Sequence, residues 1–134
     1  MLLIKKSEYA LLSLLSISKH KEPINVDILS KELQISKSFL AKIMQNLAKA
    51  NLVISHRGVN GGFVLNKPIE ELTILEIVVA ADEKNPMVFE CSDAISSCPN
   101  NKAKICTIWP LLNNLQFKVN DLLAKLTLKD IEHE

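Results

Sequence analysis

Three cysteine thiols fall within one short window of the sequence, at Cys91, Cys98 and Cys106. Thiolates are soft ligands that suit iron-sulfur clusters and zinc, and three of them on one loop can converge on a metal without a rigid scaffold. An odd number of cysteines in a chain with no export signal argues against a disulfide framework. The cysteines are therefore predicted to be metal ligands or redox groups, and three inert buried thiols are the alternative.

The segment that carries the cysteines has the composition of a loop. Residues 82–106 contain Pro86, Pro99 and several asparagines and serines, which favour irregular structure. The first 66 residues hold nine basic and four acidic side chains, a net charge of +5, whereas the remainder carries −4. Only the first half is therefore expected to meet a polyanion, although charged surfaces are more often simply solvated.

Apolar spacing upstream of this loop predicts three amphipathic helices. The first, from Ser7 to Ser18, is expected to turn Leu11, Leu14, Leu15 and Ile17 inward and Ser13 and Ser16 outward. Asn25 can cap a short second helix that buries Val26, Leu29 and Leu33, and Gln34 and Ile35 form a tight turn. Ser36 can then cap a third helix that buries Leu40, Ile43, Met44 and Leu47.

The outward face of the third helix is small, polar or cationic, with Ser38, Ala41, Lys42 and Gln45 at the helical period. Two short helices joined by a brief turn make a helix-turn-helix unit, whose second helix enters a DNA major groove. The segment after it contains all three glycines of the chain, Gly58, Gly61 and Gly62. It predicts a β-hairpin over Val53–Leu65 with Arg57 beside its tip, which gives the order of a winged helix.

Two further helices are expected after the hairpin. Thr73–Ala81 reads as a short apolar helix that completes the core. From Ile108 onward, apolar residues recur with the 4, 3 spacing of a heptad seam: Ile108, Leu112, Leu115, Val119, Leu122 and Leu126. Such a helix either packs back on its own domain or pairs with a second copy. Dimerisation is the preferred interpretation because the headpiece offers limited surface.

The fold class expected is mainly α with a small β-hairpin. Residues 1–82 are predicted to form a winged helix-turn-helix DNA-binding domain, 83–106 a cysteine-containing cluster-binding loop, and 107–134 a dimerisation helix and C-terminal tail. No signal peptide or membrane span is apparent, so we expect a cytoplasmic protein with no membrane partner. The sequence shows no phosphate-cradling loop or nucleophile elbow, and its three histidines lie in separate segments, so an enzyme is not expected.

These residues together resemble the Rrf2 (Rrf-two) family of bacterial winged-helix regulators, which includes iron-sulfur and nitric-oxide sensors. The resemblance runs from Met1 to about Ile131 and is carried by the cysteine cluster and three motifs: Ser7-Glu8-Tyr9-Ala10-Leu11, Ile35-Ser36-Lys37-Ser38-Phe39-Leu40 and Arg57-Gly58-Val59-Asn60-Gly61-Gly62-Phe63. It implies a homodimeric transcriptional regulator, expected to be a repressor, on a palindromic double-stranded DNA operator.

The resemblance also implies which residues contact DNA. Arg57 and the glycine tip at Gly61 would contact the minor groove. The third helix would contact the major groove and its phosphates through Ser36, Lys37, Ser38, Phe39 and Lys42. Each has a plainer interpretation, because Ser36 can serve only as a cap, Phe39 can belong to the core, and Lys37 and Lys42 can simply be solvated.

By the same resemblance the three cysteines hold an iron-sulfur cluster, with a 2Fe-2S cluster favoured over a 4Fe-4S cluster. The steps between them are seven and eight residues, longer than is common in the family, and Trp109 stands where IscR-type members place a histidine ligand. Glu8 is the candidate fourth ligand, reaching across the dimer, and a solvated helix-start acid is its alternative role. Glu90, Asp93, and water or another small ligand remain open.

Two other functions remain open for the cysteine loop. A regulator without a cluster could sense thiol oxidation or act through a protein partner, and a zinc ion could stabilise the DNA-binding module. Visible absorption discriminates between them, because iron-sulfur proteins are coloured and zinc or free-thiol proteins are not.

Overall fold

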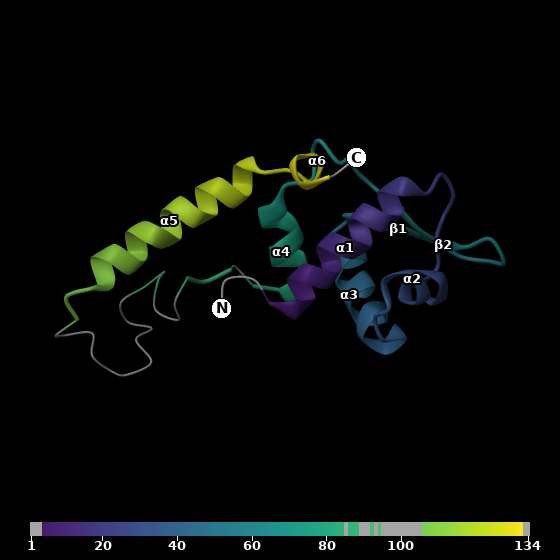
Figure 1. Ribbon diagram of the computed structural model, residues 1–134, viewed down its shortest axis with the longest axis horizontal. Helices are drawn as coiled ribbons and strands as arrows, with labels where there is room; N and C mark the ends of the chain where they lie inside the picture. Colours follow the sequence, from purple (N-terminus) through teal and green to yellow (C-terminus); the bar gives the residue numbers. More distant parts are fainter. Residues whose placement is uncertain (1–3, 85, 89–91, 93, 95–105, 133–134) are drawn as a thin grey trace.

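The computed structural model describes residues 4–84, 86–88, 92, 94 and 106–132. Eight elements follow one another in this part of the chain: α1 (Lys5–Lys19), α2 (Val26–Leu33), α3 (Lys37–Lys49), β1 (Val53–His56), β2 (Gly62–Leu65), α4 (Ile74–Asp82), α5 (Trp109–Lys125) and α6 (Leu128–Ile131). They confirm the expected fold class of a mainly helical winged helix with one antiparallel hairpin and a long C-terminal helix (Figure 1). None of the helices described is long and apolar enough to cross a membrane.

The two predicted helix caps, Asn25 and Ser36, are present at the start of α2 and α3, and Thr73 forms a third cap at the start of α4. The side-chain oxygens of Asn25, Ser36 and Thr73 each accept the backbone N–H three residues further along, at 2.8, 3.3 and 3.2 Å. Such caps satisfy donors that the first helical turn leaves unpaired. Gln34 adopts a left-handed conformation with φ 57° and ends α2, so that α3 begins after the tight turn the sequence predicted.

One core joins α1, α2, α3, the hairpin and α4. The inward positions expected on α3 are all buried, and Leu14, Leu29 and Leu72 join them at 0% exposure. β1 pairs with β2 in the register Val53↔Leu65 to His56↔Gly62, as expected for a hairpin over Val53–Leu65. The hairpin is thereby fixed against the helix-turn-helix unit by shared apolar packing.

The expectation that Ser13 and Ser16 face outward is wrong. Both are buried, at 0% and 6% exposure, together with Ser7. Ser13 donates a hydrogen bond to the carbonyl of Tyr9 at 2.7 Å, and Ser16 donates one to Oε1 of Glu32 at 2.7 Å. Small hydroxyl side chains fit where α1 packs on neighbouring helices, and these bonds offset the cost of burying their polar atoms.

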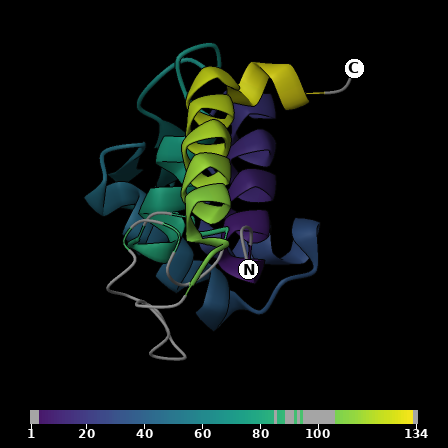
Figure 2. The same ribbon diagram turned by 90° about the vertical axis from the view of Figure 1, so that its left-hand side faces the viewer.

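The C-terminal half of the long helix α5 packs on α4, and its N-terminal half extends beyond the headpiece (Figures 1 and 2). Leu123 is buried against Ile74 and Val78 of α4, with Val119 and Leu126 packed beside it. The predicted heptad seam is therefore divided between residues that pack on their own chain and residues that are exposed. Its members Leu112, Val119 and Leu126 are partly buried on their own chain, whereas Ile108, Leu115 and Leu122 are exposed.

The short helix α6 returns the chain to the headpiece core, which the sequence did not lead us to expect. Leu128 is 0% exposed and belongs to the main core cluster. Its N–H donates to the carbonyl of Leu72 at 2.8 Å, and the N–H of Ile74 donates to the carbonyl of Leu126 at 2.8 Å. The C-terminal end of α5 is consequently bound to the residues that precede and begin α4.

Candidate nucleic-acid interface

The outward face of α3 is polar, as predicted. Ser36, Ser38, Lys42 and Gln45 are exposed, and Ala41 is half-buried among them. Because Leu40, Ile43, Met44 and Leu47 anchor the opposite face in the core, the orientation of this surface is fixed. The helix thus presents hydroxyl, amide and ammonium groups on one side, which are donors suited to phosphate oxygens and base edges.

Phe39 combines the two roles that the sequence left open. Its side chain is 36% exposed, and its ring meets that of Tyr9 edge to face, with centroids 5.5 Å apart and planes at 87°. This arrangement is a favourable aromatic geometry. Phe39 therefore braces the first turn of α3 against α1 while leaving part of its ring at the surface.

The two lysines of α3 that were predicted to contact DNA differ in their electrostatic surroundings. Lys37 Nζ lies 3.6 Å from Oδ1 of Asp27, and Lys31 Nζ lies 3.4 Å from Oδ2 of the same carboxylate. These cations, Lys31 above all, lower the pKa of Asp27. Lys42 makes no ion pair with the described residues. The charge of Lys42 is therefore less offset by neighbouring carboxylates than that of Lys37.

The hairpin tip is a five-residue loop, 57–61, between the paired His56 and Gly62. Arg57 is exposed and forms no ion pair with the part of the chain described, and Gly61 N–H donates to the carbonyl of Gly58 at 3.0 Å. Gly58 has φ 109°, a conformation that favours glycine. The tip therefore projects a free guanidinium from a tightly turned backbone.

The hairpin is positioned by an additional backbone pairing with the loop between α1 and α2. Ile24 and Phe63 exchange hydrogen bonds of 3.2 and 2.8 Å. A Cβ atom on Gly62 would lie 2.4 Å from the carbonyl carbon of Ile24, so this approach requires glycine. The distance between the hairpin tip and the helix-turn-helix unit is thereby fixed.

The predicted metal ligands are only partly described. Cys106 is partly buried three residues before α5, while Cys91 and Cys98, with the open candidates Glu90 and Asp93, lie outside the described residues. Within the described residues no group of three His, Cys, Asp or Glu side chains could hold a metal ion. The donor chemistry of three thiolates nevertheless suits an iron-sulfur cluster.

Glu8 lies on the exposed side of the first turn of α1. Its Oε2 accepts a hydrogen bond from Lys5 Nζ at 3.2 Å, and this carboxylate raises the pKa of Lys5. The contact is an exposed ion pair between residues three apart, which contributes little to stability. Trp109 occupies the position at which IscR-type members of the family have a histidine ligand, and it is the first residue of α5.

A serine, a glutamate and a histidine meet between α1 and α2, but not in a catalytic order. The hydroxyl of Ser16 and Nε2 of His20 bond to different oxygens of Glu32, at 2.7 and 3.1 Å. A nucleophilic serine must instead bond to the histidine that accepts its proton. The arrangement lowers the pKa of Glu32, chiefly through the Ser16 hydrogen bond, and joins the two helices.

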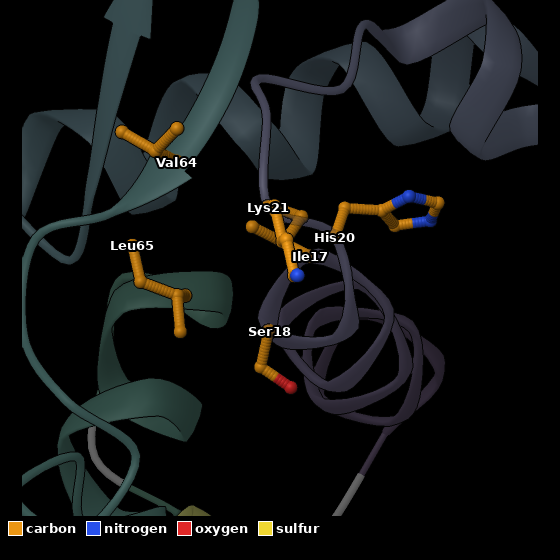
Figure 3. Close-up of a pocket in the computed structure, with 6 residues that line it drawn as sticks. All are labelled: Ile17, Ser18, His20, Lys21, Val64 and Leu65. Carbon is orange, nitrogen blue, oxygen red and sulfur yellow. The ribbon is translucent and has the colours of Figure 1, made fainter.

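Beside this network a shallow hollow separates the end of α1 from β2, and its lining is Ile17, Ser18, His20, Lys21, Val64 and Leu65 (Figure 3). Ser18 donates its hydroxyl to the carbonyl of Leu15 at 2.6 Å, and His20 is bonded to Glu32. The hollow therefore offers the Lys21 amine as its remaining charged group, and nothing in its lining assembles a reactive pair.

Several exposed apolar residues were not identified from the sequence, among them one at the hairpin tip and one beside the α5 seam. Val59 at the hairpin tip is fully exposed, and Leu111 on α5 is 58% exposed beside the predicted seam. Leu111 precedes Leu115 by four residues, so extending the apolar pattern by one position would have found it. Val59 carries no comparable pattern signal.

Comparisons with known proteins agree with this fold. The family model Rrf2, described as an iron-dependent transcriptional regulator, matches residues 3–134. The transcriptional regulator IscR of Photorhabdus laumondii subsp. laumondii is 34% identical over 133 residues, which cover 98% of this chain and 79% of that protein.

Solved structures are similar over almost the whole chain. T. potens IscR superposes with a TM-score of 0.74 at 17% identity, covering 98% of this chain and 85% of that one. Staphylococcus aureus CymR superposes with a TM-score of 0.70 at 26% identity, covering 98% of both chains. On the match of the family model, the chain belongs to the Rrf2 family of DNA-binding transcriptional regulators and is not an enzyme.

Proposed function

We propose that this regulator binds a palindromic operator as a homodimer, with α3 in the major groove and the hairpin tip in the adjacent minor groove, and that it acts as a repressor. The observation that carries the DNA-contact proposal is the outward face of α3, where Lys42 is exposed without an ion pair to the described residues while the opposite face is locked in the core. A rigid helix with such a face suits groove recognition.

Each proposed contact has a chemical basis. Ser36, Ser38 and Lys37 lie at or near the N-terminus of α3, where hydroxyls, ammonium groups and free N–H groups favour phosphate. The exposed edge of Phe39 lies in the same first turn, and Lys42 lies one turn further along the groove-facing side. Arg57 suits the negative potential of a narrow minor groove, and the compact turn at Gly61 lets the backbone approach it.

The exposed edge of the α5 seam supports the dimer. Ile108, Leu111, Leu115 and Leu122 form a stripe that is 39–58% exposed on the isolated chain. Exposed leucines at helical spacing are typical of a helix that packs against a partner helix. A second copy placed on this stripe would cover it and would bring two α3 helices onto one duplex.

The thiolates of Cys91, Cys98 and Cys106 are proposed to hold a 2Fe-2S cluster, with Glu8 of the partner subunit as the fourth ligand. Bound there, the cluster would supply a redox-labile group for sensing. Cys106 lies three residues before the start of α5, so its position affects the start of the proposed dimer helix. Oxidation or loss of the cluster would then shift the population of DNA-competent dimers.

The DNA-contact proposal is tested by selecting tight binders from random-sequence duplex DNA and measuring their affinity against salt. We expect an inverted repeat, and a log affinity that falls by roughly 0.9 per phosphate contact for each tenfold rise in salt. Lys42→Ala should weaken binding and reduce this slope, whereas Lys118→Ala on α5 removes the same charge and should leave the slope unchanged. Equal slopes for the two variants would contradict the assignment.

A further inference from the structure

The side of α5 opposite to solvent carries a stripe of amides. Asn113, Gln116 and Asn120 are spaced three and four residues apart, so they share one helical face. Gln116 is the most enclosed, at 4% exposure, and is one of two buried residues of α5. Burying a carboxamide is unfavourable unless its polar atoms are bonded, so a buried glutamine at this position requires partners.

The partners of Gln116 belong to the segment that leads into Cys91. Its Oε1 accepts the N–H of Val88 at 2.8 Å, and its Nε2 donates to the carbonyl of Pro86 at 2.7 Å. Nε2 also donates to Oδ1 of Asn120 at 2.9 Å. The backbone N–H and carbonyl of the segment require opposite ends of the amide, and this requirement fixes its orientation.

A second amide of the same stripe holds the chain on the other side of Cys91. Asn113 Nδ2 donates to the carbonyl of Ser92 at 2.8 Å, and the Ser92 side chain is fully buried. The two amides therefore attach the backbone to α5 three residues before Cys91 and one residue after it.

We propose that Asn113 and Gln116 are positioning residues for the Cys91 thiol, which couple the cysteine loop mechanically to α5. This inference rests on the proposed cluster function of the cysteines. α5 carries the exposed apolar stripe on another face, so the amide tethers connect the proposed sensor to the proposed dimer helix. With the tethers intact, the backbone at Pro86, Val88 and Ser92 is held on α5, and without them it separates from α5 more often.

The first arm of the test uses cluster-free, reduced protein and needs no bound metal. Asn113→Ala is compared with Asn114→Ala, an exposed amide at the next position of the same helix. Iodoacetamide modification of Cys91 and Cys106 is followed in the same sample by mass spectrometry. The Cys91-to-Cys106 rate ratio should rise by about two- to tenfold in Asn113→Ala, the range for losing one net hydrogen bond, and stay unchanged in Asn114→Ala.

General destabilisation raises both rates, so the ratio isolates the tether from a purely structural effect. Gln116→Leu keeps the size of the side chain without its bonds, and hydrogen exchange at the Val88 amide should accelerate in it while the exchange of the α3 core does not. An unchanged ratio in both Asn113→Ala and Gln116→Leu would overturn the proposal.

The second arm uses protein reconstituted with iron and sulfide under anaerobic conditions. The visible absorption of Asn113→Ala should decay faster in air than that of Asn114→Ala, by a factor similar to the change in thiol reactivity. Equal half-lives would contradict the positioning role. A wild-type protein that takes up no cluster would instead refute the proposed cluster function, and the alkylation ratio would still decide whether the amides position Cys91.

Discussion

Replacing Leu122 by alanine tests the proposed α5 dimer with a magnitude that follows from the structure. The side chain is 57% exposed on the isolated chain, so the fold loses little when it is shortened. Complete burial of a leucine is worth about 1.5–3 kcal/mol, and burying the exposed fraction in a partner therefore contributes about 1–2 kcal/mol per protomer. A two-fold interface contains the residue twice, which gives about 2–4 kcal/mol per dimer.

This loss corresponds to a dimer dissociation constant that is roughly 30- to 1,000-fold higher, measured by sedimentation equilibrium. Phe117→Ala is the matched control, because Phe117 is 67% exposed but lies about 140° around the helix from Leu122. The control should dimerise like the wild type. A dissociation constant unaffected by Leu122→Ala, or raised equally by Phe117→Ala, would refute the assignment of the seam.

Three further changes have defined outcomes. Arg57→Ala should lower the affinity for the selected duplex and reduce its salt slope by roughly 0.9 without changing the melting temperature, as fluorescence anisotropy and calorimetry would show; an unchanged slope contradicts minor-groove docking. Leu128→Ala should cost about 2–5 kcal/mol in urea unfolding, because the side chain is 0% exposed in the core, and a loss below 1 kcal/mol would contradict its role. The pKa of Glu32 is lowered in the fold, so its contribution to stability is present above the unfolded pKa and disappears as the pH falls through the folded one. Ser16→Ala should reduce this acid dependence in urea unfolding measured from pH 7 to pH 3, and an identical profile would show that the Ser16 hydrogen bond does not set the pKa.

Much of the headpiece could be predicted because its signals are local. The caps at Asn25 and Ser36 depend on side chains bonding three residues along the chain, and the apolar positions of α3 follow a single period. The glycines that permit the hairpin likewise lie within it. Local rules therefore sufficed for the helix-turn-helix unit and its hairpin.

The burial of Ser13 and Ser16 could not be inferred from local rules, because polarity alone suggests an outward position. Whether a serine is buried depends on how closely a distant helix approaches and whether its hydroxyl finds an acceptor, here Tyr9 and Glu32. Leu128 is a similar case. Its place in the core depends on pairing with Leu72, 56 residues earlier, which no periodicity reveals.

The candidate sites were predictable to different degrees. The exposed face of α3 follows from its amphipathic pattern, yet the ion pair of Lys37 with Asp27 arises from the packing of α2 against α3. The amides of α5 carried no interpretable signal, because Asn113 and Gln116 read as ordinary polar positions between leucines. Their partners are backbone groups more than twenty residues away.

The most direct test of the account is the affinity for the selected duplex, measured anaerobically for one preparation with the cluster reconstituted and for the same preparation after the cluster is removed. Iron and sulfide are counted per chain, and Cys98→Ala serves as the cluster-free control. The account predicts that wild-type affinity differs at least tenfold between the two forms, whereas the variant binds DNA equally in both treatments. Equal wild-type affinities, or a protein that takes up no iron and sulfide, would contradict cluster control.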